Sequence, residues 1–160
     1  MRRIISNTTP ILSLLKIDML DLLHKMYSKV IIPKAVFEEI ENGKDKSYYV
    51  DLSNIDWIDI IEISNVGSRS FFVDLDDGEA EVLVLAKELK ADLVIMDELM
   101  GRRFAKQLNY KLTGTIGILL KAKENRIIPS IGKLLKELTE KGTWINPKLI
   151  EKVLAIAKEK

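Results

Sequence analysis

Two side chains that can ligate a metal ion stand where predicted strands end. Asn7 follows the short apolar run Arg2–Ser6, and Asp97 follows the run Asp92–Met96, with Glu98 next to it. Hard divalent cations such as Mg²⁺ and Mn²⁺ prefer oxygen ligands of this kind, combined with water and phosphate oxygens. These positions therefore predict a divalent-metal site.

Two acids on predicted helices can complete such a site. Glu39 lies late in one helix and Glu79 in the first turn of another. Glu81 competes with Glu79, but two residues further on it should point well away around the helix. A cation held by such groups activates water and stabilises a leaving oxygen in phosphodiester hydrolysis.

Each of these residues also has a plainer explanation. An asparagine after a strand is often a turn or cap residue, and acids in a first turn, such as Asp76, Asp77 and Glu79, commonly serve the helix dipole. Glu39 can belong to a solvated face, and Asp97 can simply begin the next helix. Their combination at one edge of the fold favours a metal site or its degenerate remnant.

The elements that must position these residues alternate along the chain. Short apolar runs separated by amphipathic helical segments are typical of a mostly parallel sheet covered by helices, so we expect a three-layer α/β/α fold. Ligands bind such sheets beyond the carboxyl ends of the strands. The predicted strands are Arg2–Ser6, Lys29–Ile32, Trp57–Ile63, Asp92–Met96 and Tyr110–Leu112, with Trp57–Ile63 expected at an edge.

Capping residues predict where the helices begin. We expect a threonine cap with Pro10 in the first helical position, a second helix from Asp18 and a third from Pro33. Further helices are predicted over 76–89, 97–108 and 115–123, with two more from about residue 130. Residues 1–160 should form a single domain, with a core over about 2–136 and C-terminal helices over about 130–158. The apolar stripe on the last helix fits either core or interface.

Composition narrows the class of protein. Of 160 residues 47% are hydrophobic, which suffices for one core, and none is cysteine, which excludes disulfides and thiolate metal sites. Lysine plus arginine number 25 and aspartate plus glutamate 24, so the net charge of +1 gives no nucleic-acid signal. Without a recognisable signal peptide or membrane span, we expect a soluble cytoplasmic protein.

The order and spacing of these motifs resemble the PIN domain, a family of small metal-dependent ribonucleases. The resemblance covers roughly residues 2–136, and no single motif is specific by itself. The matching stretches are 6–17 (SNTTPILSLLKI), 30–40 (VIIPKAVFEEI), 75–86 (LDDGEAEVLVLA), 91–98 (ADLVIMDE) and 113–123 (TGTIGILLKAK).

The resemblance implies a Mg²⁺ or Mn²⁺ site formed by Asn7, Glu39, Glu79 and Asp97. The family has an aspartate where this chain has Asn7, so the site loses one formal charge. We expect the loss to weaken metal binding and activation of water more than it affects the fold.

Nucleic-acid contacts would need basic and hydroxyl side chains near the same edge. Arg102 and Arg103 follow Asp97 on one predicted helix and are candidates for phosphate binding, although such a face is as often simply solvated. Thr8, Thr113 and Thr115 can contact phosphate or metal-bound water. The single histidine, His24, should be structural or exposed, and both tryptophans, Trp57 and Trp144, are expected to pack rather than stack on bases.

The resemblance implies an endoribonuclease acting on RNA, in many relatives the toxin of a toxin–antitoxin pair held inactive by a small antitoxin protein. It also implies a homodimer. The alternative is a catalytically degenerate module that binds RNA or a protein partner. A nucleotide-binding protein ranks last, because the chain has neither G-x-G-x-x-G nor a P-loop.

Overall fold

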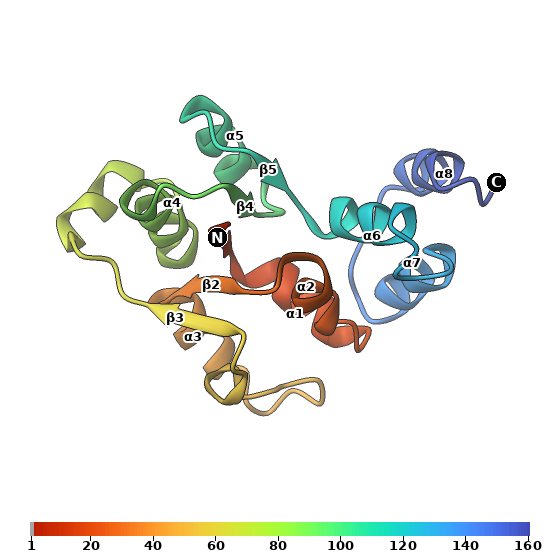
Figure 1. The fold of residues 1–160 in the computed structure, drawn as a ribbon, viewed down its shortest axis with the longest axis horizontal. Coiled ribbons are helices and arrows are strands. Elements are labelled where there is room, and N and C mark those ends of the chain that lie inside the picture. The colour runs from red at the N-terminus through yellow and green to blue at the C-terminus, as the bar shows by residue number, and fades with distance from the viewer. Residues whose placement is uncertain (1) are drawn as a thin grey trace.

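A five-stranded, entirely parallel sheet forms the centre of the computed structural model, which describes residues 2–160. The strands lie in the order β3-β2-β1-β4-β5, and helices flank the sheet in a three-layer α/β/α arrangement (Figure 1). The expected fold class is confirmed. The strands are β1 (Ile4–Ser6), β2 (Val30–Pro33), β3 (Ile58–Ile61), β4 (Leu93–Ile95) and β5 (Leu112–Thr113).

The helices follow the predicted order, with boundaries shifted by a few residues. They are α1 (Thr8–Lys16), α2 (Asp21–Tyr27), α3 (Lys34–Glu41), α4 (Asp77–Leu89), α5 (Leu99–Gln107), α6 (Thr115–Glu124), α7 (Gly132–Glu140) and α8 (Pro147–Ile156). Two 3-10 helices, η1 (Leu52–Asn54) and η2 (Val66–Phe72), lie before and after β3 in the chain. Within residues 2–160, no helix has the length and apolar character that a membrane crossing requires.

The start of α1 differs from the prediction. Asn7 is the N-cap, and Pro10 is the third helical residue instead of the first. Proline is tolerated there because the first N–H groups of a helix have no intrahelical partner. The side chain of Asn7 makes no capping hydrogen bond, so it remains available for contacts across the edge of the sheet.

The order in which strands are added to the sheet changes side between β1 and β4. The backbone N–H of Asn7 donates to the carbonyl of Ile95 at 2.9 Å, and Ser6 pairs with Ile95. From β1 the chain continues to β2 on one side, and from β4 it continues to β5 on the other. Ligands of open α/β sheets bind at such a switch point, outside the carboxyl ends of the strands. Asn7 and Asp97 both follow strands that end there.

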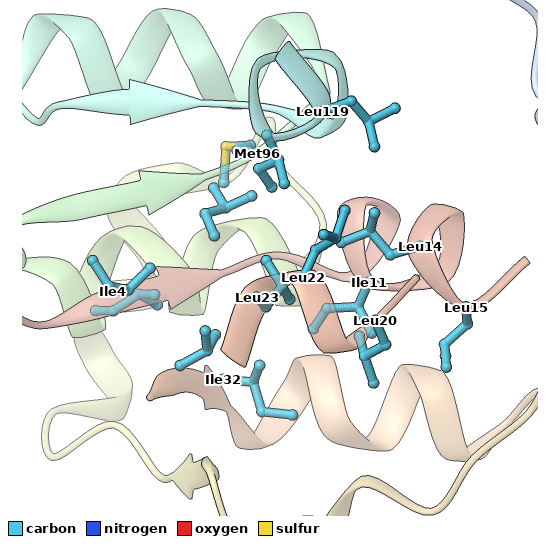
Figure 2. Close-up of a cluster of buried hydrophobic side chains, with 14 of the residues drawn as sticks. Ile4, Ile11, Leu14, Leu15, Leu20, Leu22, Leu23, Ile32, Met96 and Leu119 are labelled. Atoms are coloured by element: carbon cyan, nitrogen blue, oxygen red, sulfur yellow. The ribbon is translucent and has the colours of Figure 1, made fainter. Parts of the chain in front are cut away.

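The core lies between the sheet and its helices (Figure 2). Ile4 and Ile32 from the strands belong to the same buried cluster as Ile11 and Leu14 of α1, and all four side chains are fully buried. Each such side chain stabilises the fold by roughly 1.5–3 kcal/mol relative to exposure. The core therefore holds the β1 end and α1 rigidly, and Asn7 lies between them.

The C-terminal helices α7 and α8 lie beside α6 at one end of the molecule (Figure 1). The apolar stripe of α8 is divided: Val153 is buried, whereas Leu149 and Ile156 remain exposed. The Glu159 carboxylate then binds the N-terminus of α7, accepting from the backbone N–H groups of Ile131 and Gly132 at 2.9 and 3.0 Å. One part of the apolar stripe thus packs in the core, and the other part, with Leu149 and Ile156, stays on the surface.

Candidate functional site

Asn7 and Glu98 meet directly at the switch point. The side-chain Nδ2 of Asn7 donates to a carboxylate oxygen of Glu98 at 3.1 Å, and the Thr9 hydroxyl donates to the other oxygen of the same group. Because a carboxylate only accepts, this contact fixes the amide orientation of Asn7 and turns its Oδ1 away from Glu98.

The Oδ1 atom of Asn7 has no hydrogen-bond partner. It is the only such buried side-chain nitrogen or oxygen in the described part of the chain. An unsatisfied buried acceptor lowers folding stability by about 1–3 kcal/mol. A hydrogen-bond donor or a cation beside this atom would remove that cost. The Oδ1 atom lies close to Gly78, where an added Cβ would come within 3.4 Å of it.

Glu39 reaches the same place from α3. An added Cβ at Gly78 would lie 3.1 Å from its Oε2, the atom that accepts from the Thr8 hydroxyl at 2.9 Å. Burial raises the pKa of Glu39, and repulsion from Asp76 and Glu98 raises it further. The hydrogen bond from Thr8 lowers the pKa but does not offset these effects. The glycine therefore keeps open the space that the oxygens of Asn7 and Glu39 face.

Glu79 is the most perturbed acid of the group. It is 7% exposed, and its backbone N–H donates to the Asp76 side chain, the N-cap of α4, at 2.8 Å. Burial, followed by repulsion from Asp76, Glu98 and Glu39, raises the pKa of Glu79 from 4.5 to about 7. Crowded carboxylates behave this way when no cation neutralises them.

Asp97 faces a different partner. Its two carboxylate oxygens accept from Thr115 at the start of α6, one from the backbone N–H at 2.8 Å and one from the hydroxyl at 2.6 Å. Gly114 permits this approach, because a Cβ there would lie 2.5 Å from Asp97 Oδ1. Each oxygen keeps a further lone pair. Thr115 therefore orients the carboxylate and leaves it able to accept another hydrogen bond or to bind a cation.

The structure thus brings Asn7, Glu39 and Glu79 together and holds Asp97 at the neighbouring α6 terminus. Glu98 and Asp76, which were not among the predicted ligands, join the group instead. Over residues 2–160, no set of three or more His, Cys, Asp or Glu side chains has the arrangement of a metal site. The side-chain oxygens near Gly78 come from one carboxylate, that of Glu39, and one amide, that of Asn7.

These donors fit a hard divalent cation. The set consists of carboxylates and one amide oxygen, the chemistry that Mg²⁺ and Mn²⁺ prefer. The orphaned Oδ1 of Asn7 and the raised pKa of Glu79 are both relieved by added positive charge. A pocket of about 250 Å³, lined in part by Glu39, Asp76 and Gly78, gives access from solvent.

Glu81 takes no part in this group, in agreement with its expected direction around the helix. Its carboxylate accepts from the backbone N–H of Ala35 at 3.1 Å and from Arg69 at 3.0 Å. Arg69 also pairs with Asp77 at 2.7 Å. This arginine on η2 is a cation beside the first turn of α4 that sequence reasoning missed, because only the tertiary contact brings it there.

Most of the predicted substrate contacts are engaged within the protein. Thr8 and Thr115 are buried and position carboxylates, and Arg102 donates to the Met96 carbonyl at 2.8 Å. Thr113 is half-buried at the end of β5, whereas Arg103 is exposed on α5. Arg103 is therefore the predicted phosphate contact that stands free in solvent.

The two tryptophans differ from each other. Trp57 stacks on His24 with ring centroids 5.2 Å apart, as expected of a packing residue. The same expectation is wrong for Trp144, whose side chain is 79% exposed.

A family model described as a PIN domain matches residues 3–159, nearly the whole chain. No curated protein matches the sequence.

Proposed function

The chain belongs to the PIN-domain family, and on this premise we propose that it is a Mg²⁺- or Mn²⁺-dependent endoribonuclease. The unsatisfied, buried Oδ1 of Asn7, set beside Glu39 at the switch point of the sheet, is the observation that carries the proposal. Buried polar groups are nearly always hydrogen-bonded, so a buried acceptor without a protein partner supports a bound ion at this place.

Asn7, Glu39, Glu79 and Asp97 are the proposed ligands, with Glu98 positioned by Asn7 and Thr9. A divalent cation bound there supplies charge neutralisation for the scissile phosphate and lowers the pKa of the attacking water. Thr8 holds Glu39, and Thr115 holds Asp97, so both carboxylates are fixed before substrate arrives.

Glu79 can exchange a proton near neutral pH. Its pKa of about 7 in the absence of a cation means that the group is partly protonated under ordinary conditions. Cation binding favours the ionised form, so binding releases a proton from the site. The basic side chain of Arg103 is free to contact a neighbouring phosphate, which adds affinity without sequence selection.

Cleavage of a mixed set of end-labelled RNAs tests the proposal. Wild type is compared in EDTA, Mg²⁺ and Mn²⁺, beside Asp97→Asn, which keeps the shape of the side chain and removes its charge. We expect cuts that require the cation and fall at least about 100-fold in Asp97→Asn. Absence of cuts in every metal would favour the degenerate binding module, with Asn7 as its cause.

The proposed biological setting is a toxin–antitoxin pair, in which a small antitoxin protein restrains the nuclease, and the proposed assembly is a homodimer. The exposed apolar side chains Leu99 and Met100 at the start of α5, next to Glu98, offer a surface for such contacts. Co-production of the chain with the product of a neighbouring small gene, followed by size-exclusion chromatography, tests both.

A further inference from the structure

A second pocket opens on the other side of Asp97. It has a volume of about 360 Å³ and lies between α1, α6 and the segment that joins α7 to α8. Its lining includes the polar residues Asp97 and Thr115 and the apolar residues Ile116, Trp144 and Leu149. Thr9, which donates to Glu98, also lines it. The pocket thus adjoins the candidate metal site through Asp97 and Thr9.

The side chain of Trp144 lines this pocket and is exposed to solvent, and hydrogen bonds hold the backbone around it. The preceding N–H, that of Thr143, donates to the Leu138 carbonyl at 2.9 Å, and the following residue, Ile145, is buried. The side chain of Asn146 then caps α8 by accepting from the Lys148 N–H at 2.9 Å. These contacts hold the flanking residues in place, while the Trp144 side chain is 79% exposed and open to a ligand.

The charge of the pocket selects the kind of ligand. Asp97 is the only charged residue lining it, and no lysine or arginine contributes. A phosphate would be repelled there, whereas a neutral, flat, partly polar ring would meet an indole face, apolar side chains and hydroxyl groups. A nucleobase has those properties.

We propose that this pocket holds one unpaired nucleobase of the RNA, stacked on Trp144, with the adjoining phosphates outside the pocket and away from the Asp97 carboxylate. A base within a duplex is already stacked and paired and presents no free face, so a duplex should not fill the pocket. This inference rests on the proposed ribonuclease function and adds the residue, Trp144, on which a base of the RNA is stacked.

Fluorescence tests the pocket without requiring cleavage. The chain has two tryptophans, so Trp57→Phe leaves Trp144 as the only indole. This variant is titrated in EDTA with a short single-stranded oligoribonucleotide, with the same strand annealed to its complement, and with an abasic strand of equal phosphate number. We expect quenching by the first at concentrations roughly tenfold lower than by the other two.

Binding of labelled RNA to otherwise unchanged protein gives a second measurement. Trp144→Ala should weaken binding of the single strand by about tenfold, and Trp144→Phe should restore most of it. The control is Phe71→Ala, which removes an aromatic side chain on η2 that is 80% exposed and lies outside the pocket. It should bind like wild type.

The outcomes separate this inference from the proposed function. Quenching by single strands in a protein that never cuts RNA would support the pocket and contradict the nuclease. Metal-dependent cleavage with Trp144→Ala binding unchanged would contradict the pocket and leave the nuclease standing. Equal quenching by duplex or abasic strands, or none by any RNA, would also overturn the inference.

Discussion

The side-chain amide of Asn7 donates to the Glu98 carboxylate at 3.1 Å, across the ends of two neighbouring parallel strands. The contact neutralises no charge, yet it settles which Asn7 atom faces the open space beside Gly78. An aspartate at this position could not donate to Glu98 and would add a further negative charge. Asn7 therefore makes the site tolerable without a cation.

Asn7→Asp should lower the stability of the protein without a metal ion and raise its affinity for the ion. In EDTA its melting temperature should fall, because a new carboxylate lies beside Glu98, Glu39 and Glu79. With Mg²⁺ or Mn²⁺ it should recover, and the affinity for the cation should rise by roughly tenfold over wild type. Thermal melts with increasing cation concentration measure both effects.

The control is Asn125→Asp, which makes the same charge change on an exposed residue at the end of α6. Its melting temperature should respond to the cation as wild type does. If Asn7→Asp melts like wild type in EDTA and binds the cation no more tightly, the interpretation of Asn7 is wrong.

Glu79 predicts a particular pH dependence of stability. Its folded pKa of about 7 lies above its ordinary 4.5, so ionising it costs folding free energy. This cost is absent below about pH 4.5 and grows as the pH rises to about 7. Glu79→Gln should thus melt like wild type near pH 4.5 and at a higher temperature above pH 7 in EDTA.

Saturating Mn²⁺ should reverse the order above pH 7, because only the wild type gains from neutralising the carboxylate. Scanning calorimetry at the two pH values checks the sign. A Glu79→Gln protein that is less stable than wild type above pH 7 in EDTA would show that this carboxylate is satisfied in some other way.

Much of the fold could be predicted from sequence because its signals are local. The apolar run ending at Met96 and the acids after Asp76 mark a buried strand and a helix start within a few residues. The different surroundings of Asp97 and Glu98 could not be predicted locally. They depend on Thr115, which binds Asp97 and lies 18 residues later in the chain. The exposure of Trp144 likewise depends on how α7 and α8 pack, which its neighbours in sequence do not encode.

Thr115 is predicted to act through Asp97. Thr115→Val removes the hydroxyl that donates to Asp97 Oδ2 at 2.6 Å, a loss of about 1–3 kcal/mol in folding stability. RNA cleavage should fall by roughly tenfold as the carboxylate loses its orientation. Thr115→Ser keeps the donor and should restore both. Equal cleavage by the valine and serine variants would show that Asp97 needs no such support.

Glu159 is predicted to hold the C-terminal helices in place. Burial raises the pKa of its carboxyl, but hydrogen bonds from Lys123, Ile131, Gly132 and Ser130 outweigh burial and lower the pKa to about 2. The contribution to stability is therefore complete above about pH 4.5 and disappears as the pH falls toward 2. Glu159→Gln should lose about 1–3 kcal/mol in urea unfolding at pH 7.

The matched control for that experiment is Glu151→Gln, whose carboxylate pairs with Lys160 on the surface at 3.1 Å. Exposed pairs contribute little, so its unfolding should match wild type. A loss in Glu159→Gln that persists undiminished toward pH 2 would contradict the assignment of the effect to the charge.

A metal site between the ends of β1 and β4 is the central claim. Direct binding of Mn²⁺, with the free ion measured by electron paramagnetic resonance, tests it. Wild type should show saturable binding that Glu79→Gln and Glu39→Gln each weaken by on the order of tenfold or more. Glu81→Gln, which changes a buried glutamate of the same helix bonded to Arg69, should bind like wild type. No saturable binding by wild type, or equal weakening in Glu81→Gln, would contradict the account.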